Sequence, residues 1–298
     1  MTDTDPIILA PAPWKAKCTA YIIMIWTSGG KTGLPPKAYS PLEAASPFAS
    51  DTFGPSVGGL GMVQLVRYSE TPAGPYDEMI LVPGRFEYPL EGKDGKKTTK
   101  KALRISRIYV SQKHTTWNGR KNWNIPKHLA RFEWTEDPAT GASHVKVFPH
   151  DTVTTTAPYD ATERAPPADA APFFKCTLKP IRYTPSFPFS TTMLRYMGFD
   201  TTLVQPPLPE GKEASQGELV GTGDVWCKIP AAAFRQSSSH ASIMWADMNQ
   251  KNDTTGEAPD EFDNFWPGQS RWTIATKLAD AELIFGEGEM WTTPKSVA

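Results

Sequence analysis

Residues 118–134 read NGRKNWNIPKHLARFEW, and they place one lysine, Lys127, between a proline and a histidine where an apolar run begins. If this run is a β-strand, successive side chains point to opposite faces of the sheet. His128 and Trp134 then share one face, while Lys127 and Arg131 share the other. Lys127 and His128 are therefore expected to point in opposite directions.

Two interpretations of Lys127 are open at this point. The ordinary one is a surface lysine at the start of a solvent-facing row of charges, which is where most lysines lie. The other is a lysine that faces the lumen of a β-barrel, where loss of hydration favours the neutral amine over the ammonium ion. A neutral amine can condense with a ketone or aldehyde to an iminium ion, which draws electrons from the adjacent carbon. Alternation alone does not choose between the two faces.

Composition limits the class of protein. The chain has 298 residues, 39% of them hydrophobic, with 10 Trp and 14 Phe, which is enough for a packed core. The net charge is -1 and shows no basic region that nucleic acid or an anionic membrane would select. The apolar stretch 21–26 is too short to span a bilayer, and the start MTDTDP is acidic where a secretory signal is basic. We expect a soluble, cytoplasmic protein with a small-molecule partner.

The distribution of turn residues predicts a mainly β fold. The chain has 29 prolines and 22 glycines, and they separate short apolar runs. We expect one antiparallel β-barrel domain over residues 1–298, with extended loops near 89–101, 151–172 and 205–218. Two short helices are expected, over 37–48 and 238–250. The expected strands are 19–26, 62–68, 77–88, 104–110, 128–134, 144–150, 173–183, 201–204, 224–230 and 277–285.

Motifs for metals and cofactors do not occur in the sequence. Cys18, Cys176 and Cys227 are scattered and form no CxxC pair, so reduced buried thiols are expected rather than disulfides or a zinc site. The five histidines include no HExxH motif, and the glycine-rich stretches lack the spacing of phosphate-binding loops. We expect neither a metal nor a cofactor.

The segment around Lys127 resembles the core motif of the acetoacetate decarboxylase family. In that family GRE is followed, after a few residues, by YPKK, whose first lysine forms the Schiff base; here GRKNWNIPKH keeps Gly119, Arg120, Pro126 and Lys127 in register. Upstream, LVRY from Leu65 and GPYDEMILVP from Gly74 are similar to the family's LVRF and YTE segments. The C-terminal LADAELIFGEGEMW resembles its closing strand. The resemblance is patchy and spans most of the chain.

The resemblance implies a nearly closed barrel with the substrate in its lumen, and it implies homo-oligomers. It makes Lys127 the Schiff-base lysine and Glu78 the active-site glutamate, which alternation places on one face with Ile80 and Val82. Tyr76 is expected near the substrate. So are Arg120, His128 and Trp123, although a structural ion pair is the favoured interpretation of Arg120, and Tyr76 and Trp123 are expected to pack rather than to catalyse.

The sequence departs from the family pattern at three charged positions. His128 replaces the family's second lysine, an arginine of the family falls near Thr19, and a second glutamate falls at Ser69. The loss of an arginine and a glutamate predicts a more apolar pocket that suits a larger substrate than a four-carbon keto acid.

Three functions are compatible with this interpretation. The first is a Schiff-base lyase, for which decarboxylation of a keto acid is the family chemistry, acting on a substrate of secondary metabolism. The second is a cofactor-free cyclase or pericyclase of natural-product biosynthesis that orients a reactive substrate in the same pocket. The third is a non-catalytic carrier of an apolar ligand. Replacement of Lys127 separates them, because only the first requires the amine.

Overall fold

The computed structural model describes residues 6–29, 34, 38–50, 54–91, 95–149, 172–211, 217–250 and 270–292. The strands are β1 (Trp14–Thr27), β2 (Ser56–Glu70), β3 (Tyr76–Val82), β4 (Arg85–Glu91), β5 (Lys97–Leu103), β6 (Arg107–Val110), β7 (Lys127–Asp137), β8 (Ala142–Pro149), β9 (Phe174–Pro180), β10 (Phe187–Ser190), β11 (Leu203–Gln205), β12 (Val225–Ile229), β13 (Phe234–Asp247), β14 (Ser270–Phe285) and β15 (Glu289–Thr292). The helices are α1 (Pro41–Ala44), the 3₁₀ helix η2 (Pro47–Ala49), α2 (Lys113–Trp123) and α3 (Thr191–Tyr196). None of these described helices is long and apolar enough to cross a membrane.

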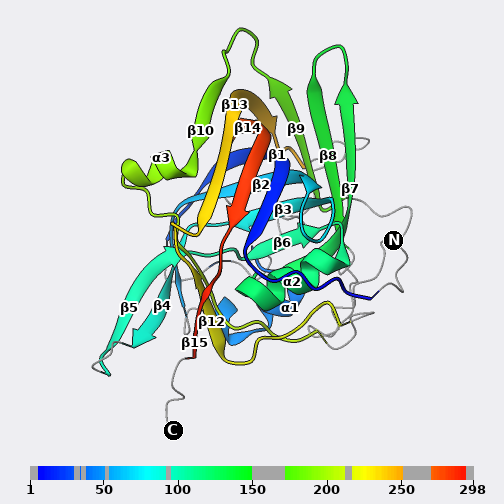
Figure 1. Cartoon of the computed structure of the whole chain (residues 1–298). Coiled ribbons are helices and arrows are strands. Elements are labelled where there is room, and N and C mark those ends of the chain that lie inside the picture. The colour runs from blue at the N-terminus through cyan, green and yellow to red at the C-terminus, as the bar shows by residue number, and fades with distance from the viewer. Residues whose placement is uncertain are drawn as a thin grey trace.

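Nine of the described strands form a closed barrel (Figure 1). Their order around the ring is β1, β14, β13, β9, β8, β7, β6, β3 and β2, and the pairing of β1 with β2 closes it. Neighbours in the ring are antiparallel except β6 and β7, which run parallel. Parallel strands need a long crossover connection, and α2 provides it. The predicted mainly β barrel is confirmed, with one parallel pair beside the crossover helix.

The interior of the barrel is packed with side chains. One apolar cluster contains a buried residue from every strand of the ring: Ile23, Val63, Met79, Tyr109, Ala130, Val147, Phe174, Met244 and Ala275. Because only the inside of a closed ring brings all of its strands together, this cluster is the barrel core. The lumen is therefore filled by the protein's own side chains.

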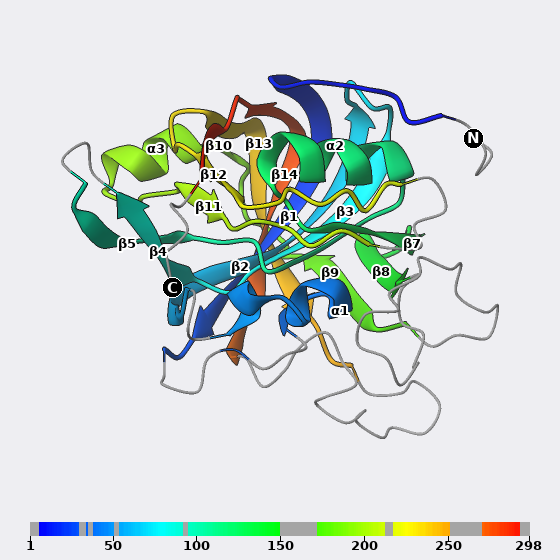
Figure 2. The same ribbon diagram turned by 90° about the horizontal axis from the view of Figure 1, so that it is seen from below.

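A second layer covers the outer face of β1, β2, β3 and β6. It consists of α2 and a smaller sheet in which β2 continues into β4, β5, β11, β12 and β15. Figure 2 shows α2 on one side of the barrel strands, with β11 and β12 beside it. A second apolar cluster lies between the barrel wall and this layer. On β1, for example, Ile23 points into the barrel core and Ile22 points toward the second layer.

The loop predictions had different outcomes. The expected loop 89–101 is largely the hairpin of β4 and β5, in which Leu90 pairs with Thr98. The lysine-rich β5 is exposed over most of its length, so it lacks the apolar alternation by which strands are recognised. Residues 206–211 form no regular element, but they are partly buried against α2 rather than projecting into solvent. The expected loop 151–172 lies almost wholly outside the described residues.

Of the two expected helices, the structure contains the first, and the second segment is a strand. The proline-broken helix over 37–48 is confirmed as α1 and η2. The helix expected over 238–250 is wrong, because most of this segment belongs to β13. It is hydrogen-bonded between β14 and β9, and these long-range pairings override the local helical pattern.

Candidate active site

Lys127 is the first residue of β7, directly after the crossover helix. Asn124 ends α2 in the left-handed conformation, with φ 52°, and its side chain donates to the carbonyls of Pro206 and Val225. The amide of Lys127 donates to the carbonyl of Ile125 at 2.8 Å. Helix α2, its end and the start of β7 are thus fixed together, and they set the direction of the lysine side chain.

The stem of Lys127 crosses α2 at Gly119. A Cβ atom at Gly119 would lie 2.5 Å from Cδ and 2.8 Å from Cε of the lysine, which no real side chain permits. The glycine of the GRKNWNIPK segment therefore has a physical role. It lets the lysine lie flat against the helix and directs its amine back between the barrel wall and α2.

The amine of Lys127 is surrounded by polar groups although it is buried. Nζ lies 2.7 Å from Oε2 of Glu78, 2.8 Å from Oγ1 of Thr115 and 3.3 Å from the hydroxyl of Tyr76. Lys127 is 4% exposed and Glu78 is 3% exposed, so this ion pair is shielded from solvent. The two charges attract each other strongly there, because little water screens them.

Tyr68 and Tyr76 complete a ring of polar contacts around this pair. The Tyr68 hydroxyl donates to Oε1 of Glu78 at 3.0 Å, and Tyr76 is hydrogen-bonded to Thr115 and Tyr68. Burial first, and then the negative charge of Glu78, raise the pKa of both tyrosines well above the usual value. Both hydroxyls therefore stay protonated and can donate hydrogen bonds or a proton.

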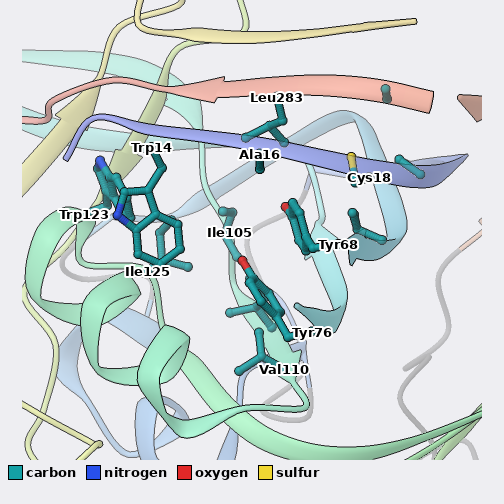
Figure 3. Close-up of a cluster of buried hydrophobic side chains, with 14 of the residues drawn as sticks. Trp14, Ala16, Cys18, Tyr68, Tyr76, Ile105, Val110, Trp123, Ile125 and Leu283 are labelled. Atoms are coloured by element: carbon teal, nitrogen blue, oxygen red, sulfur yellow. The ribbon is translucent and has the colours of Figure 1, made fainter. Parts of the chain in front are cut away.

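The ring forms one end of a cavity of about 570 Å³ between the barrel wall and the second layer. Figure 3 shows Trp14 and Trp123 at one side of the surrounding apolar cluster and Tyr68 and Tyr76 at the other. Trp26, which lines the cavity, is 53% exposed, so the cavity opens away from Lys127. The remaining lining is mostly apolar, including Ile22, Met24, Met62, Ile80, Val82, Ile105, Ile108 and Phe285.

The expected position of the site in the barrel lumen is wrong. Lys127 and Glu78 face the covered outer side of the barrel, while Ala130 and Met79 face the packed core. Both faces of this wall are apolar, because a second layer covers the outside. Alternation in the sequence therefore separated the two faces correctly but could not show which one encloses the cavity.

His128 and Arg120 lie outside the cavity lining, although both were expected near the substrate. Nε2 of His128 lies 2.6 Å from Oε2 of Glu43, and Nη1 of Arg120 donates to Oε1 of the same carboxylate at 2.9 Å. Arg120 also donates to the carbonyls of Pro209 and Val220. Both side chains thus bind other parts of the protein. We therefore assign them a structural role next to the site rather than contact with the substrate.

Glu43 connects α1 to this support. Burial opposes ionisation of its carboxyl, but the charges of His128 and Arg120 and their hydrogen bonds outweigh burial and lower its pKa. Arg120 also lies 3.4 Å from the carbonyl of Lys127. The network therefore holds the backbone from which the lysine side chain starts.

Tyr76 and Trp123 both line the cavity, as expected for residues near the substrate. The indole of Trp123 donates to the carbonyl of Gly286 at 2.8 Å and packs edge-on against Trp14, with 5.4 Å between ring centroids. Trp123 is thus a fixed wall, whereas the Tyr76 hydroxyl reaches the amine.

Thr115 and Tyr68 were not identified from the sequence. Thr115 belongs to α2, whose buried face is largely polar, so no apolar period marked this helix. The Asn-Ile-Pro sequence from Asn124 was a signal for the end of a helix, because asparagine and a following proline are common there. Tyr68 stands in the LVRY segment, on the same face of β2 as Gln64.

A second, polar cleft of about 860 Å³ lies on the other side of the two tyrosines. Thr19 and Ser69 line this cleft and not the apolar cavity. The apolar lining of the cavity therefore does not depend on these two positions, and the expectation of an apolar substrate stays a prediction. Cys18 also lines the cleft, and burial, followed by the charge of Glu78, raises its pKa to about 12.

The potential metal ligands of the described residues form no group of three or more. The three cysteines are buried free thiols, as the sequence predicts.

Solved structures with the same fold bear out the resemblance. Acetoacetate decarboxylase from Legionella pneumophila superposes with a TM-score of 0.54 over 97% of this chain and 92% of that chain, at 11% identity. The chain has the acetoacetate decarboxylase fold. An acetoacetate decarboxylase-like enzyme from Sphingomonas wittichii gives a TM-score of 0.52 over 96% of this chain and 95% of its own, at 12% identity.

Sequence similarity to known proteins is more limited. No family model matches the chain. A segment of 89 residues, 30% of this chain, is 29% identical to Protein NEOXANTHIN-DEFICIENT 1 of Oryza sativa subsp. japonica and spans 26% of that protein. The acetoacetate decarboxylase fold is therefore shared with solved structures at 11–12% sequence identity.

Proposed function

We propose that this chain is a Schiff-base enzyme in which Lys127 attacks the keto group of an apolar substrate. The observation that carries the proposal is the buried pair of Lys127 and Glu78 at one end of an otherwise apolar cavity. A buried lysine with an adjacent carboxylate is the arrangement that amine catalysis needs, because the carboxylate can take the proton that makes the amine nucleophilic.

The reaction begins with transfer of a proton from the Lys127 ammonium to Glu78, 2.7 Å away. The amine then forms a C–N bond with the keto carbon, and the carbonyl electron pair moves to oxygen. Tyr76, whose hydroxyl is 3.3 Å from Nζ, can donate a hydrogen bond to this oxygen. One proton from the attacking nitrogen and the proton held by Glu78 convert this oxygen to water, which leaves, so that an iminium ion and the Glu78 carboxylate remain.

In a β-keto acid the iminium ion accepts the electron pair of the bond to the carboxylate. Carbon dioxide leaves, and Glu78, which has taken up a proton from solvent, protonates the resulting enamine on carbon. Water then hydrolyses the new iminium ion, which releases the ketone and restores the lysine. Loss of carbon dioxide is the reaction named for the solved acetoacetate decarboxylases that share this fold.

The cavity supports a substrate larger than acetoacetate. Its volume of about 570 Å³ falls in the range of pockets that enclose drug-sized ligands, roughly 300–1,000 Å³. The apolar lining between Lys127 and the opening suits a hydrocarbon or ring system attached to the keto group.

One observation favours a second function. Lys127 contacts three polar side chains, which suits a fixed ammonium donor as well as a nucleophile. In that case the chain is a cofactor-free cyclase, and the cavity orients a folded substrate while the lysine polarises one oxygen.

Borohydride trapping tests the proposal. The protein is incubated with ketones and β-keto acids, reduced, and mapped by peptide mass spectrometry. We expect one adduct, on Lys127, that is absent in Lys127→Met and present in Lys228→Met, a partly exposed lysine paired with Glu289. No adduct in the folded wild type, or adducts spread over surface lysines, would reject the Schiff-base function and favour the cyclase.

A further inference from the structure

A polar pair lies within the apolar cavity, away from Lys127. Gln64 on β2 donates from Nε2 to Oε1 of Gln236 on β13 at 3.0 Å. Both side chains line the cavity and are buried, at 5% and 1% exposure. Among the described residues, Nε2 of Gln236 has no hydrogen-bond partner.

This arrangement is costly if its only role is structural. A primary amide has two donor hydrogens and an acceptor oxygen, and a buried donor without a partner loses its hydration without gaining a hydrogen bond. The cavity wall near the pair is mostly apolar, with Thr191 beside Gln236, so methionine or leucine would fill the same space without this loss. An amide retained at such a position needs an explanation, and recognition of a ligand provides one.

The register of the strands gives the distance from the proposed reaction site. On β2, Gln64 lies opposite Ile80, and Val66 lies opposite Glu78. Two residues of an antiparallel strand span about 7 Å, so the amide pair lies roughly 7 Å along the sheet from the level of Glu78. Ile80 and Met62 supply apolar wall near this part of the cavity.

We infer that Gln64 and Gln236 form a second recognition site, in which Nε2 of Gln236 donates a hydrogen bond to an oxygen of the ligand. The inference rests on the proposed function in one respect: the keto group of the ligand is taken to lie at Lys127. It defines the substrate class: an apolar molecule with a keto group and a second, uncharged oxygen roughly 7 Å away.

The second oxygen is a carbonyl, ether or hydroxyl rather than a carboxylate. The amide is neutral, and Arg85, the other positively charged residue of the described lining besides Lys127, already interacts with Asp200, so an ionised carboxylate at the amide would lack a free counter-ion. The buried lysine is already paired with Glu78 at the closed end.

The test uses two long-chain methyl ketones of equal length as probes. One of them carries a second carbonyl oxygen about 7 Å from the first. Their dissociation constants are measured by tryptophan fluorescence, since Trp14, Trp26 and Trp123 line the cavity. The full chain with Lys127→Met is used, so that only non-covalent binding is recorded. We expect it to bind the dicarbonyl probe about tenfold more tightly.

Variants of Gln236 identify the donor. Gln64→Met/Gln236→Met in the same background removes both amide donors and should bind both probes equally. Gln236→Glu, which replaces the donor by acceptors and still accepts from Gln64, should also lose the preference. Met62→Leu, which changes apolar wall, should keep it. Equal affinity before the amides are changed, or a preference that persists in Gln64→Met/Gln236→Met and in Gln236→Glu, would overturn the inference.

The binding test and the borohydride test can fail independently of each other. An adduct on Lys127 in wild type together with equal affinities would reject the amide site and leave the lysine chemistry standing. A clear preference without any adduct would retain the amide site and reject the Schiff-base reaction.

Discussion

The Cβ position of Gly119 on α2 lies 2.5 Å from Cδ of Lys127 on β7. In the interior of a helix, replacing glycine by alanine is normally stabilising by about 1 kcal/mol. At this position the added methyl group must displace the lysine stem. We therefore predict that Gly119→Ala lowers the free energy of unfolding by about 1–3 kcal/mol and impairs adduct formation at Lys127.

A double-mutant cycle measured by chemical denaturation checks this prediction. In a Lys127→Ala background the stem is absent, so Gly119→Ala should stabilise the protein by about 1 kcal/mol, as in an ordinary helix. If Gly119→Ala stabilises both backgrounds equally, the close approach does not constrain the lysine.

Thr115 is predicted to position the amine of Lys127. Thr115→Val keeps the shape of the side chain but removes Oγ1, which lies 2.8 Å from Nζ. Without this hydrogen bond the amine can leave the attacking geometry, and we expect the rate of adduct formation to fall about 10- to 100-fold.

Thr115→Ser is the matched control, because it retains the hydroxyl and should react at close to the wild-type rate. Circular dichroism shows whether the variants remain folded, and the rate of borohydride-trapped adduct formation gives the result. A serine variant as slow as the valine variant would mean that the methyl group, through packing, is what matters.

Much of the site could be predicted because Lys127 and Glu78 stand in regular strands. Alternation placed Glu78 with Ile80 and Val82, and the structure puts all three on the cavity. Alternation also separated Lys127 from His128, which point to the cavity and to Glu43 respectively. Such predictions succeed because successive side chains of a strand point to opposite faces, so two residues share a face when an even number of positions separates them.

The remaining features depend on contacts between distant segments. Helix α2 buries polar residues such as Thr115 and Arg120, so its pattern does not resemble an amphipathic helix. Gln64 and Gln236 are 172 residues apart and meet only when β2 and β13 face the same cavity. Whether that cavity lies inside or outside the barrel depends on the second layer, which no local pattern encodes.

Glu43 should make the protein sensitive to acid. Its pKa is lower in the folded protein than the value of 4.5 for a free glutamate side chain. A group with a lowered pKa in the folded state stabilises the protein fully above its unfolded pKa, and this stabilisation is lost as the pH falls through the folded pKa. The contribution of Glu43 is therefore present above about pH 5 and declines at lower pH.

Glu43→Gln tests this dependence, since it keeps the size of the side chain and removes its charge. We expect the variant to be less stable than wild type at pH 7, because Arg120 then lacks its buried counter-ion. The difference between the two proteins should shrink as the pH is lowered from about 5 towards 3 in urea unfolding experiments. A constant difference over this range would show that the charge of Glu43 is not the cause.

The amide pair of Gln64 and Gln236 is predicted to cost stability. Replacing both residues by methionine removes two buried amides, one of them with an unpartnered Nε2, and leaves apolar groups of similar size. We expect Gln64→Met/Gln236→Met to be at least as stable as wild type, by up to about 1 kcal/mol. The single Gln236→Met variant leaves Nε2 of Gln64 without its acceptor and should lose about 1–2 kcal/mol.

Urea unfolding of the wild type, both single variants and the double variant separates the two explanations of the pair. If recognition of a ligand maintains the pair, removing both amides restores stability while the preference for the dicarbonyl probe stays lost. If the double variant is less stable than the wild type, the hydrogen bond between the amides holds β2 and β13 in place. The pair would then be structural, because replacing it by apolar side chains would sacrifice an interaction that the fold requires.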